Sequence, residues 1–259
     1  MIPLSKKLFP ILEFDDTAEA IFSASDNTII SKPLPERCVI SFFGDSIDNF
    51  VNKENLDVYE FLTFESRKIP LYIFEKNQTK ILVVHGLGSG PYAAGLLEKL
   101  IAFGCKKFIV CGGCGVLDED ISVGQLLLPM KALRDEGTSY HYLQPNQFIN
   151  MDDAVINKIK LILNSKNVTF KEVVTWTTDA IYRETLPKIK LRREYGCNVV
   201  EMECASFLAV AKFRNVELGQ ILYSGDDLST NEWSEREWKK QTKTRMDIFE
   251  LAMEICRCI

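Results

Sequence analysis

The sequence contains only two histidines and no apolar run long enough to span a membrane. With only His85 and His141 available, a histidine-rich metal site is excluded. No stretch of about 18 consecutive apolar residues occurs, which argues against a transmembrane helix. The first residues, MIPLSKKLFPILEFDD, have no continuous apolar run ahead of their acids, unlike a secretory signal. We therefore expect a cytoplasmic protein with no membrane partner.

The chain also has no excess of basic charge. Lys and Arg together number 31 and Asp and Glu 36, which gives a net charge of −5. Because nucleic acids are bound through basic surfaces, we expect no nucleic-acid partner. Eight cysteines are too few for a disulfide scaffold in a chain of this length, and most lie in apolar runs. We expect them to be reduced, buried thiols.

What the sequence does contain is the composition of a globular protein. It has 259 residues, of which 46% are apolar and 26% charged. This length suits one large α/β domain or two small ones. No Ser/Gly-rich linker, internal repeat or low-complexity tract divides it. We therefore predict a single domain over residues 1–259, with residues 1–37 as an N-terminal extension of uncertain structure.

Expected strands and helices alternate along the chain. The strands are expected at 38–43, 70–76, the run ILVVH that ends at His85, 107–111, 125–129, 170–178, 198–200 and 219–224. The helices are expected from Ala93 to a cap at Gly104, at 151–167, at about 202–213, and from Ser234 to the end. This alternation predicts an α/β fold with a largely parallel sheet and helices on both faces.

Two glycine-rich turns follow expected strands. HGLGSGP (85–91) opens a helix, where free backbone amides can hold an anion, although it could equally be a tight turn. Pro91 replaces the third glycine of a dinucleotide fingerprint, so NAD binding is disfavoured. Cys111 and Cys114 have the spacing of a redox or zinc pair, but no second ligand pair follows them. The plainer interpretation is a glycine loop at the ligand-binding end of a strand.

Three acids lie in otherwise apolar surroundings. Glu201 and Glu203 lie between an apolar strand and an apolar helix. Unpaired buried carboxylates are costly, so these two either have partners, have a function, or cap the helix. Asp226 directly follows the strand GQILYS, at the end of the sheet where ligands bind. It could act as a general acid or as a helix cap.

Five segments together resemble the family of purine nucleoside and uridine phosphorylases, which includes nucleosidases acting on methylthioadenosine and adenosylhomocysteine. They are GLGSGPYAAGLLEKLIAFGCKKFIVCGGCG, LPMKALRDEGTSYHY, TWTTDAIYRET, VVEMECASFLAVAKFR and ILYSGDDLS. The resemblance implies a mixed, mostly parallel sheet in one domain and a homodimer or homohexamer. It also implies cleavage of a ribosyl N-glycosidic bond with phosphate as co-substrate and with neither metal nor organic cofactor.

The resemblance also assigns roles to individual residues. Asp226 matches the acid that protonates the leaving purine, Glu203 the glutamate that binds the ribose hydroxyls, and Met202 the methionine under the sugar. The residues expected to touch the base are Cys114, Gly115, Ile181, Tyr182 and Glu201.

The expected phosphate site departs from the family pattern. It would involve Gly44, Gly113 and Arg183, but Asp48 and Val110 stand where the family has arginines. An aspartate there would repel a phosphate dianion.

Two further positions bear on the phosphate site. A third family arginine, lent by a neighbouring subunit, would fall near Asn55, and the family hydroxyl residue is replaced by Gly113. Arg134, like Arg183, is a candidate substitute.

These observations lead to an expected function in nucleoside metabolism and nucleotide salvage. We expect a nucleoside phosphorylase, a pentosyltransferase, with purine nucleosides favoured and uridine as the other substrate. A nucleosidase that uses water is the alternative within the enzyme class. A nucleoside-binding relative without turnover is the alternative outside it, although such a protein would need neither Glu203 nor Asp226.

Overall fold

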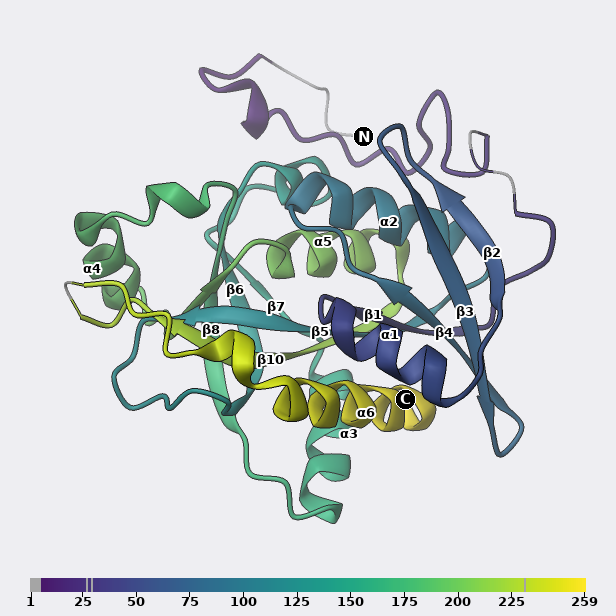
Figure 1. Cartoon of the computed structure of the whole chain (residues 1–259). Coiled ribbons are helices and arrows are strands. Elements are labelled where there is room, and N and C mark those ends of the chain that lie inside the picture. The colour runs from purple at the N-terminus through teal and green to yellow at the C-terminus, as the bar shows by residue number, and fades with distance from the viewer. Residues whose placement is uncertain (1–5, 27, 29, 231) are drawn as a thin grey trace.

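The structure, a computed structural model, describes residues 6–26, 28, 30–230 and 232–259. These residues form a ten-stranded mixed sheet flanked by helices (Figure 1), which confirms the expected α/β architecture. The strands are β1 (Arg37–Ser41), β2 (Val58–Thr63), β3 (Lys68–Lys76), β4 (Thr79–His85), β5 (Lys107–Val116), β6 (Leu126–Asp135), β7 (Phe148–Asn150), β8 (Lys171–Thr178), β9 (Val199–Glu201) and β10 (Glu217–Asp227). The helices are α1 (Gly44–Lys53), α2 (Gly90–Ala102), α3 (Asp153–Ser165), α4 (Leu186–Glu194), α5 (Cys204–Arg214) and α6 (Thr242–Cys258).

The sheet is partly closed on itself. Its strand order is β10-β6-β8-β9-β5-β1-β4-β3-β2, and β10 also pairs with β5. The strands β5, β9, β8, β6 and β10 therefore form a closed ring, while β1, β4, β3 and β2 extend from it. Pairing of β5 with β1 and with β10 is parallel, so the carboxyl ends of these three strands meet at one side of the ring.

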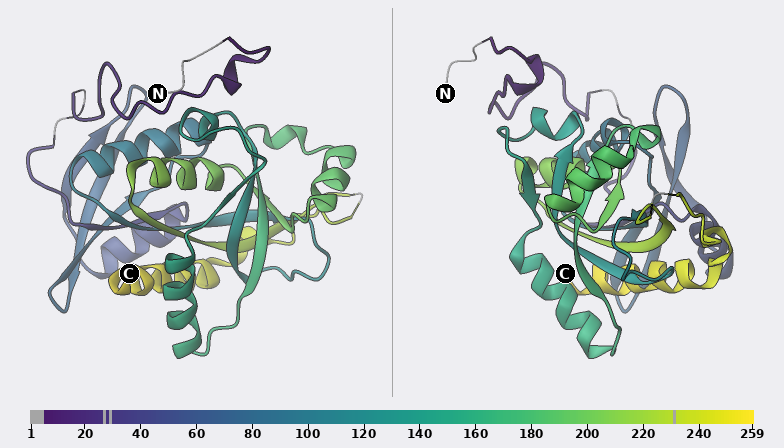
Figure 2. Two further views of the ribbon diagram at one scale, coloured as in Figure 1. Left: turned by 180° about the vertical axis from the view of Figure 1, so that it is seen from behind. Right: turned by 90° about the vertical axis from the view of Figure 1, so that its left-hand side faces the viewer.

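Helices cover the two faces of the sheet in separate layers. The α2 and α5 helices pack against each other on one face, and α1 and α6 pack together on the other (Figure 1). From behind, α3 projects away from both layers (Figure 2). Between the layers, the apolar residues Ile81–Val84 of β4 are fully or almost fully buried, as are Phe108–Cys111 of β5.

Local sequence explains several element ends. The Asp152 side chain accepts hydrogen bonds from the Ala154 and Val155 backbone N–H groups and so caps α3, as its acidic start predicted. The α2 helix ends at Ala102, and Gly104 follows with a φ of +121°, as the expected cap requires.

The last helix begins later than the sequence predicted. It starts at Thr242 rather than near Ser234. Arg236 and Glu237 have φ values of +47° and +50°, which interrupt any helix. The Arg236 guanidinium instead donates to the carbonyl oxygens of Gly225 and Ile121. The sequence analysis also missed α1, α4, β2 and β7.

The expected N-terminal extension is largely irregular where it is described; residues 1–5, 27 and 29 of it lie outside the described residues. One 3₁₀ turn, η1 (Pro10–Leu12), interrupts it. The segment lies across the outer side of α2 (Figure 2). Arg214 of α5 donates to the Ala18 carbonyl oxygen at 2.8 Å, and Leu34 N donates to the Phe103 carbonyl oxygen at 3.0 Å.

The cysteines are unpaired thiols. Seven of the eight are buried, whereas Cys258 is exposed in the last turn of α6, contrary to the expectation that all would be buried. Among the described residues, no helix combines the length and apolarity needed to cross a bilayer.

Candidate active site

The first part of the site is a buried carboxylate at the junction of β9 and α5. Glu201 Oε1 accepts hydrogen bonds from the hydroxyls of Thr177 at 2.6 Å and Thr175 at 3.2 Å. Its Oε2 accepts from the backbone N–H groups of Glu203 at 2.8 Å and Cys204 at 2.6 Å. Glu201 therefore caps α5, which was one of the alternatives that the sequence left open.

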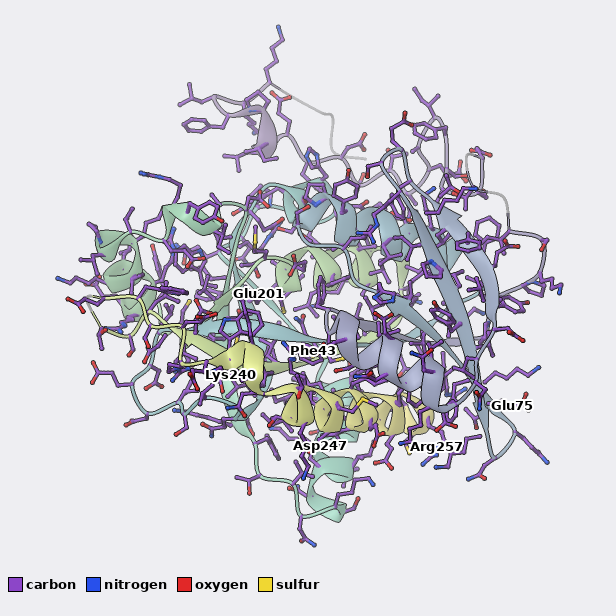
Figure 3. All side chains as sticks on the ribbon, in the orientation of Figure 1. Phe43, Glu75, Glu201, Lys240, Asp247 and Arg257 are labelled. Atoms are coloured by element: carbon purple, nitrogen blue, oxygen red, sulfur yellow. The ribbon has the colours of Figure 1, made fainter. Side chains whose placement is uncertain are left out.

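These four contacts define what Glu201 does. Burial raises its pKa, and the four donors oppose that rise. Figure 3 shows the residue in the interior, close to α5. Because both of its oxygens already have two protein donors, the structure gives Glu201 a bracing role. The expected role of contacting a base is not supported by this geometry.

Glu203 lies two residues further on, at the N-cap position of α5. Its Oε1 accepts a hydrogen bond from the Ser89 backbone N–H at 2.6 Å. Burial raises its pKa to about 8, with the neighbouring Glu201 carboxylate as the second cause and the Ser89 hydrogen bond opposing both. Glu203 is therefore mostly a neutral acid at pH 7. Met202, between the two glutamates, is half-buried.

The glycine-rich turn before α2 holds Glu203 in place. Ser89 precedes α2 with a φ of +116°, a backbone conformation that side-chain-bearing residues rarely adopt. In this conformation its N–H points at the Glu203 carboxyl group. The anion-binding turn predicted from HGLGSGP thus has an internal carboxyl group as its partner.

Asp226 lies where the register between β10 and β5 is interrupted. The regular pairing stops at Ser224 and resumes at Asp227, so Gly225 and Asp226 form an irregularity. Asp226 Oδ2 accepts a hydrogen bond from the Trp233 indole N–H at 2.7 Å. The Gly225 carbonyl oxygen accepts from Arg236 at 2.8 Å, and Arg236 lies 3.7 Å from Asp227. The loop after β10 therefore fixes the backbone and the side chain around Asp226.

The end of β5 lies next to Asp226 and also next to β9, the strand that ends at Glu201. A Cβ on Gly115 would lie 3.6 Å from Asp226 Oδ1 and 3.0 Å from Val200 of β9. The neighbouring Cys114 thiol is buried, and both Glu201 and Asp226 contribute to raising its pKa after burial itself. The structure thus brings Cys114, Gly115, Glu201 and Asp226 together near the carboxyl ends of β5 and β10, and Glu203 follows Glu201 by two residues.

The segment after β8 supplies a further acid. Ile181 and Tyr182 are 52% and 94% exposed, and Arg183 is exposed too. Glu184 follows them and is half-buried. Burial, and then the Asp226 carboxylate, raise the pKa of Glu184 to about 7. Glu184 therefore lies close enough to Asp226 for the Asp226 charge to disfavour its ionised form.

The region of the expected phosphate site contains a histidine and an aspartate. Gly44 begins α1, and a Cβ at this position would lie 3.9 Å from His85 Nδ1. Asp48 Oδ1 lies 3.7 Å from His85 Nε2. Val110 is completely buried, whereas Gly113 is exposed. Asp48 is therefore paired with a histidine, a contact that the sequence analysis did not foresee.

Arg134 is not available as a substitute phosphate ligand. Its guanidinium is buried and donates to the Ser139 hydroxyl at 2.8 Å. It also donates to the carbonyl oxygens of Gln144 at 2.8 Å and Leu143 at 3.2 Å. These contacts hold the loop after β6, so the expectation that Arg134 could bind phosphate is wrong for this structure. Asn55 lies beyond the carboxyl end of α1, away from the Gly44 turn.

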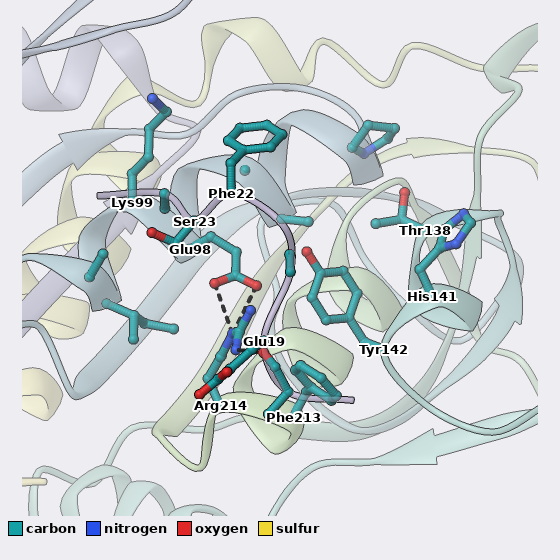
Figure 4. Close-up of a pocket in the computed structure, with 18 of the residues that line it drawn as sticks. Glu19, Phe22, Ser23, Glu98, Lys99, Thr138, His141, Tyr142, Phe213 and Arg214 are labelled. Carbon is teal, nitrogen blue, oxygen red and sulfur yellow. Dashed lines mark hydrogen bonds and ion pairs between the residues drawn. The ribbon is translucent and has the colours of Figure 1, made fainter. Parts of the chain in front are cut away.

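A large hollow in the described structure is separate from these acids. It has a volume of about 1360 Å³ and lies between the N-terminal segment, α2 and the loop after β6 (Figure 4). Figure 4 shows Arg214 paired with Glu98 at its edge, where the distance is 2.9 Å. Neither Glu203 nor Asp226 lines it, so the hollow is not the candidate active site that these acids form. Among the described residues, no group of three or more His, Cys, Asp or Glu side chains could hold a metal ion.

Several residues of the site could not be found from sequence motifs. Tertiary folding brings three side chains to Asp226 or its neighbours. Glu184 comes from the segment after β8, and Trp233 and Arg236 come from the loop after β10. His85 offered a signal, because it immediately precedes the glycine-rich turn. Its partner Asp48 was noted in the sequence only because it stands where the family has an arginine.

Comparison with protein-family models gives one match that spans most of the chain. Residues 36–254 match the model of the phosphorylase superfamily. A DeoD-type purine nucleoside phosphorylase of Buchnera aphidicola is 26% identical over 187 residues, which cover 70% of this chain and 77% of that one. An uncharacterised protein of Acanthamoeba polyphaga mimivirus is 28% identical over 162 residues, 62% of this chain and 63% of its own length.

Solved structures share the fold at lower identity. The 5′-methylthioadenosine/S-adenosylhomocysteine nucleosidase of Campylobacter jejuni aligns with a TM-score of 0.72 at 15% identity and covers 87% of this chain and all of its own. The uridine phosphorylase of Vibrio fischeri also aligns with a TM-score of 0.72, at 19% identity, over 87% of this chain and 92% of its own.

Proposed function

Because the chain belongs to the phosphorylase superfamily, we propose that it cleaves the N-glycosidic bond between the ribose and the base of a nucleoside, with purine nucleosides favoured. The observation that carries this proposal is that Asp226 and Glu201 both lie close to Cys114 at the end of β5, with Glu203 two residues after Glu201 at the start of α5. Glu203 is buried and Asp226 is half-buried. One can therefore hold the ribose of a bound nucleoside while the other protonates its base.

Glu203 is suited to position the ribose. Its carboxyl group is held by the Ser89 N–H and, with its pKa raised to about 8, carries a proton at neutral pH. A neutral carboxyl group can donate one hydrogen bond and accept another, which matches two adjacent ribose hydroxyls. Fixing the sugar in this way lowers the entropic cost of reaching the transition state.

The base end of the site is suited to supply a proton. As the glycosidic bond breaks, its electron pair moves onto the base, and protonation of the base stabilises it as a leaving group. Asp226 is our proton donor. The half-buried Glu184, whose pKa is raised to about 7, provides a second carboxyl group from which the proton can be replenished. Trp233 orients Asp226 through the 2.7 Å hydrogen bond.

A base-release assay tests this proposal. Purified protein is incubated with a panel of purine and pyrimidine nucleosides, and free base is quantified. Glu203→Ala should lower kcat/KM at least about fivefold, because it removes two hydrogen bonds from a neutral carboxyl group, each contributing roughly 0.5–1.5 kcal/mol. Asp226→Asn should lower it by roughly 10²-fold or more on purine nucleosides and less on pyrimidine nucleosides.

The matched control is Glu119→Gln, which neutralises an exposed acid in the loop after β5. It should behave as wild type. Nucleoside binding with no base release from any substrate would instead support a binding protein without turnover. Release that is unaffected by Glu203→Ala in a folded protein would contradict the proposed ribose contact.

The identity of the attacking group determines the product. With phosphate as co-substrate the product is ribose 1-phosphate, and with water it is ribose. The family resemblance favours phosphate, whereas the residues around Gly44 favour water. We also propose, from the resemblance, that the reaction needs neither a metal nor an organic cofactor and that the chain works as a homodimer or homohexamer in the cytoplasm.

A further inference from the structure

A histidine and an aspartate face each other at the end of β4, and the proposed sugar and base contacts do not use them. His85 is the last residue of β4 and is paired in register with Ser41 of β1. Its Nε2 lies 3.7 Å from Asp48 Oδ1 on α1. Its Nδ1 lies 3.9 Å from the place of a Cβ on Gly44, so the glycine puts no side chain of its own against this nitrogen.

The loop that follows His85 links this pair to the ribose position. Residues 86–88 connect His85 to Ser89, whose backbone N–H is bound to Glu203. Gly86 N donates to the Ser41 carbonyl oxygen at 2.7 Å and so anchors the beginning of the loop to β1. A sugar bound by Glu203 would therefore lie beside a short loop whose other end is the imidazole.

The charges around His85 suit a neutral imidazole. Burial lowers its pKa, Arg67 in the turn between β2 and β3 lowers it further, and Asp48 opposes both. Tyr72 of β3 also faces Asp48, which contributes to raising the tyrosine pKa. Asp45, in the first turn of α1, is paired with Arg245 of α6. A neutral imidazole with one nitrogen toward a carboxylate and the other toward an open position is the usual arrangement of a general base.

The same region is poorly suited to a phosphate dianion. Val110 is apolar and buried, Gly113 has no side chain, and Arg134 is occupied by the loop after β6. Asp48 adds a negative charge, and its side chain is 70% exposed. Recognition of phosphate depends on charged, often bidentate donors, so water fits this set of residues better.

We propose that His85 accepts a proton from an attacking water molecule and that Asp48 is a positioning residue for its imidazole. This inference rests on the proposed glycosidic cleavage and names its attacker. The water oxygen forms a bond to the sugar carbon C1′ while the bond from C1′ to the base nitrogen breaks, its electron pair remaining on the base. One water proton passes to His85 Nδ1, and the base takes a proton from Asp226. Solvent then removes the proton from His85 and returns one to Asp226, so the net reaction consumes one water.

Product analysis with His85 variants provides the first test. Wild-type protein and His85→Gln are assayed without phosphate and with 10 mM phosphate, and ribose and ribose 1-phosphate are separated. We expect wild type to give ribose in both buffers, and His85→Gln to lose roughly 10²-fold in kcat with little change in KM. His141→Gln replaces the other histidine of the chain, which is exposed in the loop after β6, and should match wild type.

The pH profile distinguishes chemistry from a structural role. Asp48→Asn removes a group that raises the His85 pKa, so the acidic limb of kcat/KM should move to lower pH. Arg67→Gln removes a group that lowers it, so the limb should move to higher pH. Each shift should be at least about 0.5 pH unit. Gly44→Ala, which adds a methyl group at ordinary contact distance from Nδ1, should keep the fold and reduce turnover.

The outcomes separate this inference from the function on which it rests. Base release that is equally fast in wild type and His85→Gln, or stoichiometric ribose 1-phosphate at 10 mM phosphate, would overturn the role of His85 and leave glycosidic cleavage intact. Acidic limbs that do not move in Asp48→Asn and Arg67→Gln would also overturn it. No base release by wild type from any nucleoside would overturn both proposals together. Thermal unfolding of each variant shows whether it is folded.

Discussion

Two glutamates that lie two residues apart have opposite surroundings. Glu201 has four hydrogen-bond donors, whereas Glu203 has the Ser89 N–H and lies beside the Glu201 carboxylate. The difference follows from the chain direction at the junction of β9 and α5. One side chain turns back to cap the helix, and the other points toward the turn before α2. With fewer donors to stabilise its charged form, Glu203 has a pKa that burial and then the Glu201 carboxylate raise to about 8.

The raised pKa of Glu203 predicts a pH dependence of stability. Its pKa is about 8 in the folded protein against 4.5 as the ordinary value, so unfolding releases a proton between these pH values. The Glu203 contribution to the free energy of unfolding therefore falls as pH rises from 4.5 to 8, by up to about 1.4 kcal/mol per pH unit. Glu203→Gln keeps the shape of the neutral acid and should remove this slope.

Denaturant unfolding at several pH values between 5 and 8 measures the effect. The slope of Glu203→Gln is subtracted from that of wild type, because Glu184 and Glu201 also have raised pKa values and contribute dependences of the same sign. Glu119→Gln serves as the control. Parallel slopes for wild type and Glu203→Gln would show that Glu203 is ionised in the fold at neutral pH.

At the scale of single elements, the end of β5 packs tightly against β9 and against the chain at the end of β10. A Cβ on Gly115 would lie 2.6 Å from Leu228 Cδ1, a distance that forces Leu228 to move, and a tight 3.0 Å from Val200 Cγ1. Asp226 lies against the same glycine. The position therefore requires glycine because of its packing against β9 and the chain after β10.

Gly115→Ala should consequently lose both stability and activity. Overpacking of this kind costs roughly 1–3 kcal/mol, and the shift of Leu228 should displace Asp226 and reduce base release. Gly113→Ala is the matched control for stability. It lies on the same strand, and its nearest heavy atom would be Tyr223 Cδ1 at 4.0 Å, an ordinary contact. Chemical unfolding of both variants provides the comparison, and equal stabilities would contradict the packing argument.

Elements with strong apolar patterns were predicted from sequence, and weakly patterned ones were not. The strands around Val83, Ile109 and Ile221 consist of apolar runs that the sheet buries completely. The α1 helix is an exception, because Ile47, Phe50 and Val51 at helical spacing give it an apolar face that the sequence analysis missed. The late start of α6 depends on Arg236 reaching Gly225, a tertiary contact that no local pattern encodes.

The candidate site divides in the same way. Glu203 and Asp226 were identified because they interrupt apolar segments and match the family motifs. The partners Ser89, Trp233 and Glu184 could not be predicted, since each reaches an acid from a separate loop. Sequence therefore located Glu203 and Asp226, and the fold supplied their hydrogen-bond donors and the nearby Glu184.

At the scale of the whole molecule, the described N-terminal segment makes polar contacts with α5, with β2 and with the end of α2. Arg214 joins three parts of the chain, because it pairs with Glu98 of α2 and donates to the Ala18 carbonyl oxygen. Several apolar side chains of this segment remain exposed, among them Leu8, Phe9, Ile21 and Phe22. The segment is therefore expected to detach more readily than any sheet strand.

Arg214→Ala should accelerate detachment of the N-terminal segment. Of the two contacts of Arg214, only the hydrogen bond to Ala18 holds the segment, and losing it should cost about 0.5–1.5 kcal/mol, a roughly two- to thirteenfold larger open population. Limited chymotrypsin digestion should then cut faster after Phe14 and Phe22. Lys212→Ala, at an exposed position on the same helix, should digest like wild type. Equal cleavage rates for Arg214→Ala and wild type would show that other contacts hold the segment.

The closed ring of strands has a consequence for how copies of this protein can aggregate. A strand inside a ring has both of its backbone edges paired, so growth by addition of a foreign strand cannot begin there. Apart from the short β7, the described sheet path is open only at β2, where Val58 and Phe61 are exposed. Ser31 donates to Glu60 at 2.8 Å, and Tyr59 donates to the Pro33 carbonyl oxygen at 3.2 Å, so the N-terminal segment also shields this border. Losing that shield would leave β2 as the place where intermolecular β-pairing starts.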